Sequence, residues 1–175
     1  MRWEDQGAGG ALRHTVIPRT LCFLRWGDEV LLLRGAATKS LWAGRLNGIG
    51  GHIEVGETPL AGARREILEE TGLVVLDLSL RGVVHVCALA ATQGIMIFIY
   101  VGQAPSREVR PSSEGDLLWF PINALPRDAL VEDLSELIPR VLEATGDHPV
   151  YGLYQPDEQG RITFSFSTGI PTLIP

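Results

Sequence analysis

A cluster of charged residues after residue 56 constrains this chain more than any other feature. Its members stand at fixed spacing: Glu57, Arg65, Glu66, Glu69 and Glu70. The last three glutamates occupy positions i, i+3 and i+4, which share one side of a helix and can converge on a hard cation through oxygen ligands. The segment therefore predicts a helix that carries a magnesium site. The alternative is a solvated helix face whose glutamates pair with neighbouring arginines, at about 0.3–0.5 kcal/mol for each pair.

Helix-boundary signals flank this cluster. Thr58 can cap a helix N-terminus, Pro59 is tolerated in a first turn, and Gly72 can end the helix in a left-handed conformation. An apolar stripe on a different side from the glutamates would face the core, and it consists of Leu60, Ala63 and Ile67.

The remaining pattern predicts a sheet. Apolar runs at 20–24 and 30–33 around Trp26-Gly27-Asp28 indicate a hairpin. The further expected elements are strands at 74–80, 83–91, 95–101 and 117–120, a helix at 134–143, and a closing hairpin at 151–154 and 162–166. Strands interspersed with helices that cover them make the fold class α+β.

The organisation expected from this pattern is one domain over residues 14–175, preceded by a flexible arm over residues 1–13. Between the first hairpin and the charged cluster lie four glycines, Gly44, Gly48, Gly50 and Gly51, which allow the backbone to approach a ligand or another segment closely.

Composition excludes several classes of function. The net charge of −6 argues against binding to duplex nucleic acid, which needs clustered Lys and Arg. No apolar run approaches the roughly 20 residues that span a bilayer, so no membrane association and a cytoplasmic location are expected. Cys22 and Cys87 have no C-x-x-C partner, which argues against a zinc ribbon, and His52 and His85 are predicted to stand alone.

The full spacing of the acidic segment is Gly51-x5-Glu57-x7-Arg65-Glu66-Ile67-x-Glu69-Glu70-x-Gly72-Leu73. It resembles the signature of the Nudix hydrolases at every position. The resemblance implies an α/β/α sandwich with a central mixed sheet. It also implies Mg²⁺ as cofactor, with Mn²⁺ as the alternative ion, and a small-molecule nucleotide as substrate.

Carried over by position, the resemblance makes Glu66, Glu69 and Glu70 the metal ligands and lets the Gly51 carbonyl supply a backbone oxygen. Arg65 would orient the carboxylates. Glu57 would support the helix start by pairing with this arginine, although simple helix capping is the alternative for Glu57.

A further acidic residue in such enzymes often comes from a loop after the sheet. Glu114 stands where related enzymes place a metal-binding or base-like carboxylate. Glu108 and Asp116 share this polar loop, and a solvated loop charge is the alternative interpretation.

The segment from Trp42 to Gly51 resembles the approach to the signature in the MutT-like branch that hydrolyses oxidised purine nucleoside triphosphates. Asn47 falls on the base-reading asparagine of that branch, and its amide offers both a donor and an acceptor to a purine edge. The alternative is a turn-forming asparagine beside glycine. Glu132 and Asp133 align with an acid pair that recognises the base edge, although a solvated helix start would explain them equally.

Two details depart from that branch. Its acid pair begins with Asp where this chain has Glu132, and Leu130 stands in place of a base-stacking Trp. The ring of Trp42 is the candidate substitute. Tyr151-Gly152-Leu153-Tyr154 resembles the aromatic segment that follows there.

The hypothesis that follows is a magnesium-dependent pyrophosphohydrolase that converts 8-oxo-dGTP or a related nucleotide to the monophosphate and pyrophosphate. One alternative keeps the chemistry and takes ADP-ribose or dinucleotide polyphosphates as substrate. Another is a catalytically silent nucleotide-binding module, against which the complete set of signature glutamates argues.

Overall fold

The computed structural model describes residues 14–37, 42–90, 92–143 and 148–168, without the side chains of 88–90 and 168. The predicted arm over residues 1–13 lies outside the described residues. Among the described residues, none of the helices has the length and apolar character needed to cross a membrane.

The core of the fold is a mixed sheet of eight strands. Seven follow the order β3-β2-β1-β5-β4-β7-β8, and β6 pairs with β2. The strands are β1 (Thr15–Trp26), β2 (Glu29–Gly35), β3 (Leu46–Asn47), β4 (Leu78–Ala90), β5 (Gln93–Gln103), β6 (Gly115–Pro121), β7 (Val150–Pro156) and β8 (Ile162–Thr168). The pairs β1–β5 and β4–β7 are parallel and the other named pairs are antiparallel.

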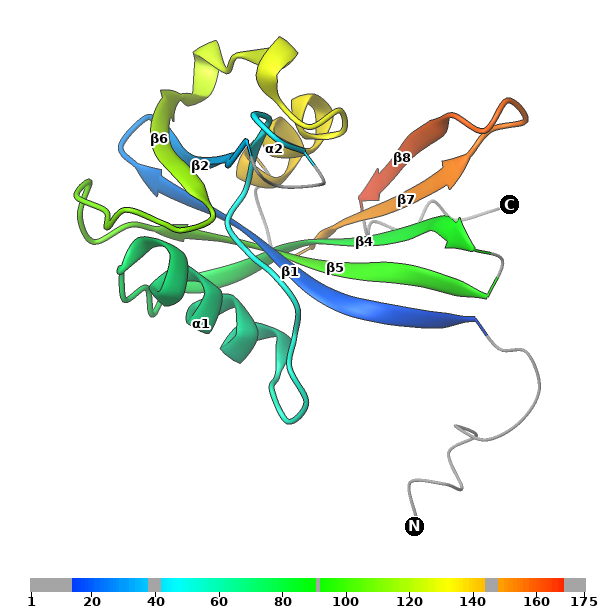
Figure 1. Ribbon diagram of the computed structural model, residues 1–175, viewed down its shortest axis with the longest axis horizontal. Coiled ribbons are helices and arrows are strands. Elements are labelled where there is room, and N and C mark those ends of the chain that lie inside the picture. The colour runs from blue at the N-terminus through cyan, green and yellow to red at the C-terminus, as the bar shows by residue number, and fades with distance from the viewer. Residues whose placement is uncertain (1–13, 38–41, 91, 144–147, 169–175) are drawn as a thin grey trace.

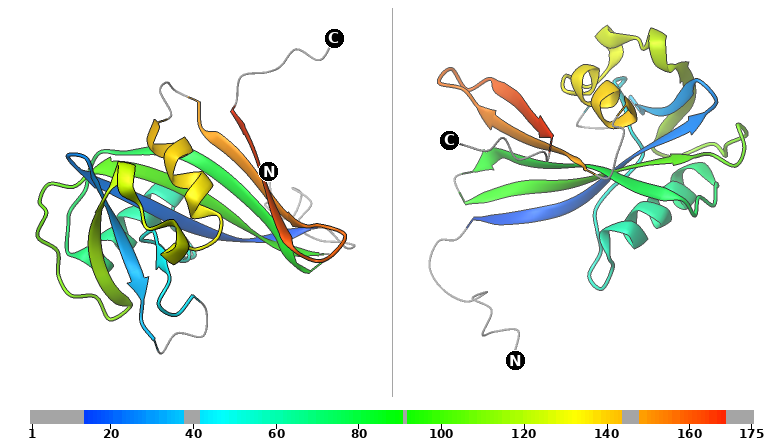
Figure 2. Two further views of the ribbon diagram at one scale, coloured as in Figure 1. Left: turned by 90° about the horizontal axis from the view of Figure 1, so that it is seen from above. Right: turned by 180° about the vertical axis from the view of Figure 1, so that it is seen from behind.

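One long helix covers each face of the sheet, with α1 (Pro59–Thr71) on one side and α2 (Leu134–Glu143) on the other (Figures 1 and 2). Neighbouring residues of β2 serve the two layers: Leu31 belongs to the apolar cluster with Ile67 of α1, and Leu32 belongs to the cluster with Ile138 of α2. Successive strand side chains point to opposite faces, which is why both are fully buried. The predicted α+β fold with a covered mixed sheet is confirmed.

Most predicted elements are present, and the region around Arg81 is the exception. The prediction of two strands at 74–80 and 83–91 is wrong, because β4 runs from Leu78 to Ala90 as one strand with a register shift between Leu80 and Gly82. A Cβ atom on Gly82 would lie 3.0 Å from the side chain of Ile99, so this glycine serves close packing and does not form a turn.

The strand β1 changes partner along its length, and this change positions the glycine-rich segment. Leu24 to Trp26 pair with β2, whereas Cys22 forms an isolated bridge with Ile49 through hydrogen bonds of 2.6 and 3.1 Å. Further down, the Thr20 amide donates to the Gly51 carbonyl at 2.9 Å. The segment before α1 is therefore held against the middle of the sheet.

Candidate active site

Local signals in the sequence build the helix that carries the glutamates. The Thr58 hydroxyl accepts a hydrogen bond from the Ala61 amide at 3.2 Å, and Gly72 ends the helix with φ 77°. The stripe predicted to face the core does so, since Ala63 and Ile67 are fully buried against β1 and β2. This packing fixes the rotation of α1, and with it the direction of each glutamate.

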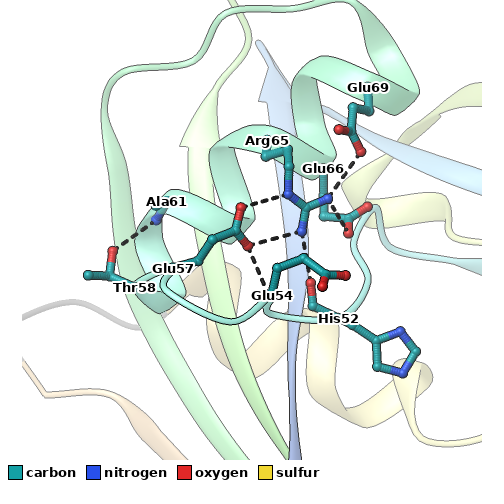
Figure 3. A network of polar contacts seen from close by, with 8 residues as sticks. All are labelled: His52, Glu54, Glu57, Thr58, Ala61, Arg65, Glu66 and Glu69. Carbon is teal, nitrogen blue, oxygen red and sulfur yellow. Dashed lines mark hydrogen bonds and ion pairs between the residues drawn. The ribbon is translucent and has the colours of Figure 1, made fainter.

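Arg65 is the centre of a network that joins the helix to the loop before it (Figure 3). Its guanidinium donates to both carboxylate oxygens of Glu57 at 2.8 and 3.1 Å, and to the carbonyl of His52 at 2.9 Å. The same group donates to Glu66 at 2.8 Å and to Glu69 at 3.1 Å. All five donors of the planar fork are thereby directed at acceptors of the site, which a lysine could not reproduce.

The network shifts proton affinities in the expected directions. Hydrogen bonds from Arg65 and from the Glu54 amide hold the pKa of Glu57 below its ordinary value. Bonds to Glu57 and Glu66 raise the pKa of Arg65. Glu57 and Arg65 are therefore both charged at neutral pH, and both carboxylate oxygens of Glu57 accept hydrogen bonds from Arg65.

Glu66 and Glu70 lie against the sheet, whereas Glu69 is more exposed. The Glu66 carboxylate contacts Gly51 so closely that a Cβ atom there would lie 2.7 Å from the carboxyl carbon. Glu70 is only 7% exposed. Burial raises the pKa of the Cys22 thiol, and the charges of Glu70 and Glu66 raise it further, so both carboxylates face this strand residue.

The donor set fits a hard divalent cation. The groups gathered between α1 and β1 are carboxylates and backbone carbonyls, which are the ligands such ions prefer. The Gly51 carbonyl accepts from Thr20 and keeps a second lone pair. The Thr20 hydroxyl is buried on the same strand face as Cys22 and has no hydrogen-bond partner within the described part of the chain. A buried polar group without a partner calls for an explanation, and an ion or water bound on this face of β1 would supply one.

Glu114 lies at the start of β6, outside the Arg65 network. Its backbone bonds to Ala36 and to the Ser112 hydroxyl. The link of its loop to α1 runs through Arg110, which donates to the Leu68 carbonyl at 2.7 Å and to the Thr71 carbonyl at 2.8 Å. Sequence reasoning missed this arginine, because no local pattern marks an arginine that caps a helix 42 residues earlier.

A second group of predicted residues meets at the short strand β3. The Val131 amide donates to the Leu46 carbonyl at 3.0 Å, which sets Asn47 beside the segment that carries Glu132 and Asp133. Arg45 braces this junction by donating to the carbonyls of Asp128 at 2.7 Å and Leu130 at 3.2 Å. Residues more than eighty positions apart are thus neighbours.

The polar side chains at this junction already have partners. The Asn47 side-chain oxygen accepts from the Gly48 amide at 2.8 Å, so its NH₂ group is the part left to face a ligand. Asp133 accepts from the Tyr154 hydroxyl at 2.8 Å. Burial raises the pKa of Asp133 despite this bond. Glu132 is exposed and lies 4.0 Å from Arg45.

Two positions, Trp42 and Leu130, bear on stacking against a base, and the structure places them differently. Trp42 is exposed and has a positive φ of 56°. Its backbone carbonyl lies against Gly35 at the end of β2. Leu130, at the position of the stacking tryptophan, is 1% exposed within the core cluster of α2. The leucine therefore packs in the interior and offers no surface to a base.

The predicted isolation of His85 is wrong. The Nε2 atoms of His85 and His14 lie 2.8 Å apart, and the Cys87 sulfur lies 3.6 Å from His85. His14 immediately precedes β1, and His85 and Cys87 lie on β4. The two strands are neighbours only through β5, which the sequence spacing does not reveal. His52 contributes its backbone carbonyl to Arg65, as described above.

Sequence comparison gives this geometry its context. The NUDIX domain family model matches residues 16–141. An oxidized purine nucleoside triphosphate hydrolase from Mus musculus is 32% identical over 130 residues, which cover 71% of this chain and 78% of that protein. The protein of the same description from Danio rerio is 32% identical over 97 residues, covering 54% of this chain and 61% of the relative, less than two thirds of its length.

The fold agrees. The crystal structure of a mutator MutT protein from Bacillus halodurans has 23% sequence identity and a TM-score of 0.71, over 87% of this chain and 98% of that chain. Nudix hydrolases generally use divalent metal ions and act on small nucleotide substrates, and the match to relatives named as nucleoside triphosphate hydrolases supports a hydrolase. On the family match and the intact helix signature, the chain belongs to the Nudix family.

Proposed function

We propose that this protein is a magnesium-dependent pyrophosphohydrolase that adds water to an oxidised purine nucleoside triphosphate, such as 8-oxo-dGTP, and releases the monophosphate and pyrophosphate. Mn²⁺ is the alternative ion. The observation that supports the proposal is the bond between Leu46 and Val131, since it sets Asn47, the asparagine that we propose reads the base, beside Glu132 and Asp133. The names of the Mus musculus and Danio rerio relatives support the same substrate class.

In this proposal Glu66, Glu69 and Glu70 would hold the metal, together with the Gly51 carbonyl and Glu114. A bound divalent ion neutralises phosphate oxygens and helps to activate water, which is the chemistry it supplies in phosphoryl transfer. Arg65 fixes Glu66 and Glu69 in one orientation through the two bonds described above. Glu57 in turn fixes Arg65, so it acts as a positioning residue.

The base would be held at β3. Asn47 can donate from its NH₂ group, and Asp133 is kept in place by Tyr154. Desolvation raises the pKa of the half-buried Asp133, whose carboxyl oxygens can accept from the donors of a purine edge. Glu132 and the exposed ring of Trp42 would complete the rim. Because Leu130 is buried in the core, stacking at that position is absent from the proposal.

The test is a substrate panel in the presence of Mg²⁺, with pyrophosphate and monophosphate release measured for 8-oxo-dGTP, dGTP, other nucleoside triphosphates, ADP-ribose and a dinucleotide polyphosphate. A kcat/KM preference for 8-oxo-dGTP over dGTP is the expected result. A preference for ADP-ribose or a dinucleotide would refute base reading by Asn47 and leave the metal helix intact. No turnover of any nucleotide with Mg²⁺ or Mn²⁺ would refute the enzyme as proposed.

A further inference from the structure

We propose that His14, His85 and Cys87 form a second metal site, built for Zn²⁺ or a chemically similar transition-metal ion and separate from the carboxylates of α1. The structure describes all three residues, and the ligand atoms of the two histidines and the cysteine all lie within 4.8 Å of one another. Two imidazoles and a thiol are borderline-to-soft donors, which such ions prefer and Mg²⁺ does not.

One of the three separations already has the length expected for two ligands of one ion, and the other two need small side-chain movements. Zinc bonds of about 2.0–2.1 Å to nitrogen and about 2.3 Å to sulfur place tetrahedral ligands roughly 3.3–3.6 Å apart. The Cys87 sulfur lies 3.6 Å from Nε2 of His85, which matches this spacing. It also lies 3.7 Å from Nδ1, nearly equidistant from the two ring nitrogens, so a rotation of the Cys87 side chain would bring the sulfur to an ion bound at Nε2. The two Nε2 atoms, at 2.8 Å, are at hydrogen-bond distance, so the His14 ring would move back by about half an ångström to admit an ion.

The order of the strands brings the three side chains together, and the absence of a side chain at Gly94 leaves room for them. His85 and Cys87 are two apart on β4 and therefore point to the same face. His14 precedes β1, on the far side of β5, and Gly94 of β5 lies between them. A Cβ atom on Gly94 would lie 2.8 Å from Nε2 of His14, so the missing side chain provides the space that the imidazole fills.

A further sulfur atom, from Met96, lies near the two histidines and the cysteine. Met96 pairs directly with His85 in the β4–β5 register, which places its thioether on the same face of the sheet. His14 is exposed, while His85 and Cys87 are half-buried. A site of this kind is accessible to an ion from solvent and leaves a coordination position for water or another ligand.

The site lies well away from the helix glutamates. Thr20, which bonds to Gly51, is six residues beyond His14, and an extended strand covers about 20 Å over that length. Figure 1 shows the beginning of β1, the end of β4 and the beginning of β5 together at the end of the sheet that α1 does not cover. An ion bound here would link His14, just before β1, to His85 and Cys87 on β4, with β5 between the two strands.

The experiment uses the full chain, freed of metal and then held in saturating Mg²⁺ so that hard oxygen sites are filled. Titration with Co²⁺, a spectroscopic probe for zinc sites, should produce a thiolate-to-metal charge-transfer band at one equivalent. Cys87→Ser should abolish the band. Both Cys87→Ser and His85→Ala should weaken Zn²⁺ binding at least about tenfold, because even indirect supports of metal ligands contribute that much.

His148→Ala, which removes an exposed histidine outside the group, is the matched control and should bind Zn²⁺ as the parent does. Glu70→Gln should also leave the band unchanged, which separates this site from α1. Zn²⁺ should raise the Tm of the parent and not that of Cys87→Ser. The absence of a charge-transfer band in the parent, or equal Zn²⁺ affinity in the parent and Cys87→Ser, would overturn the proposal and leave a hydrogen-bonded histidine pair.

Discussion

The Nε atom of Arg65 donates to Oε1 of Glu57 at 2.8 Å, and the neighbouring Nη2 donates to Oε2 of the same carboxylate at 3.1 Å. This fork-to-fork pair joins the middle of α1 to the loop that precedes it. Arg65 uses its remaining Nη1 atom for Glu66 and Glu69. The orientation of two proposed metal ligands therefore depends on a carboxylate that lies outside the helix.

This dependence predicts the effect of Glu57→Gln. The amide removes one acceptor and the negative charge, so Arg65 is held less firmly and the proposed metal ligands Glu66 and Glu69 lose their orientation. We expect kcat/KM, or the apparent affinity for Mg²⁺, to fall by about 10–100-fold with the fold retained. Steady-state rates measured across a Mg²⁺ titration check it. Glu54→Gln is the control, since the bonds of Glu54 to Glu57 use its backbone amide and carbonyl, which the substitution keeps. Equal losses in both variants would contradict the role of Glu57.

Glu70→Gln tests the metal site itself. Glu70 is buried beside Cys22 with its charge directed at the sheet, and we propose that it binds the ion. Removing that charge should lower kcat by on the order of 10²–10³ while circular dichroism stays unchanged. Glu143→Gln at the end of α2 should leave kcat as it is. An unchanged rate in Glu70→Gln would remove this residue from the mechanism.

Asn47→Ala tests base reading. The side-chain NH₂ group is proposed to contact the base equally in the bound substrate and in the transition state, so its loss should raise KM more than it lowers kcat. Kinetics with 8-oxo-dGTP and dGTP measure both constants. Asn123→Ala, at an exposed asparagine of the 3-10 turn after β6, provides the comparison. Identical kinetic constants for Asn47→Ala and the parent would exclude Asn47 from the site.

The environment of the half-buried Asp133 predicts a pH effect on stability. Its pKa in the folded state is raised by burial above the unfolded value of about 3.9. The folded state therefore binds the proton more tightly, and the contribution of this carboxyl is complete below about pH 3.9 and is lost as pH rises through the folded-state pKa. Asp133→Asn keeps an acceptor for Tyr154 and removes the titration.

Urea unfolding at several pH values measures this effect. The free energy of unfolding of Asp133→Asn should gain on that of the parent as pH rises above 4, whereas Asp77→Asn, at an exposed aspartate, should follow the parent. A constant difference across the pH range would contradict the raised pKa. Tyr154→Phe, which removes the donor to Asp133, should lower stability by about 0.5–1.5 kcal/mol at any one pH.

The sequence by itself determined helix α1, which carries the proposed metal ligands. Thr58, Pro59 and Gly72 set its ends, and Ala63 with Ile67 set its buried side, so the placement of Glu66 and Glu70 followed. The first hairpin was equally readable. These features depend on residues within a few positions of one another, whose geometry is fixed by the 3.6-residue helical turn and the two-residue strand repeat.

Tertiary structure decided the rest. The bond between Leu46 and Val131, the cap that Arg110 places on α1, and the meeting of His14 with His85 join residues 42 to 85 positions apart. Local patterns do not reveal which strands become neighbours, so the sequence predicted an isolated His85. In the structure, the strand order β1-β5-β4 places His14 over Gly94, next to His85. The burial of Leu130 and the single strand through Arg81 depend on the same long-range packing, because side chains from distant segments fill the space that decides each of them.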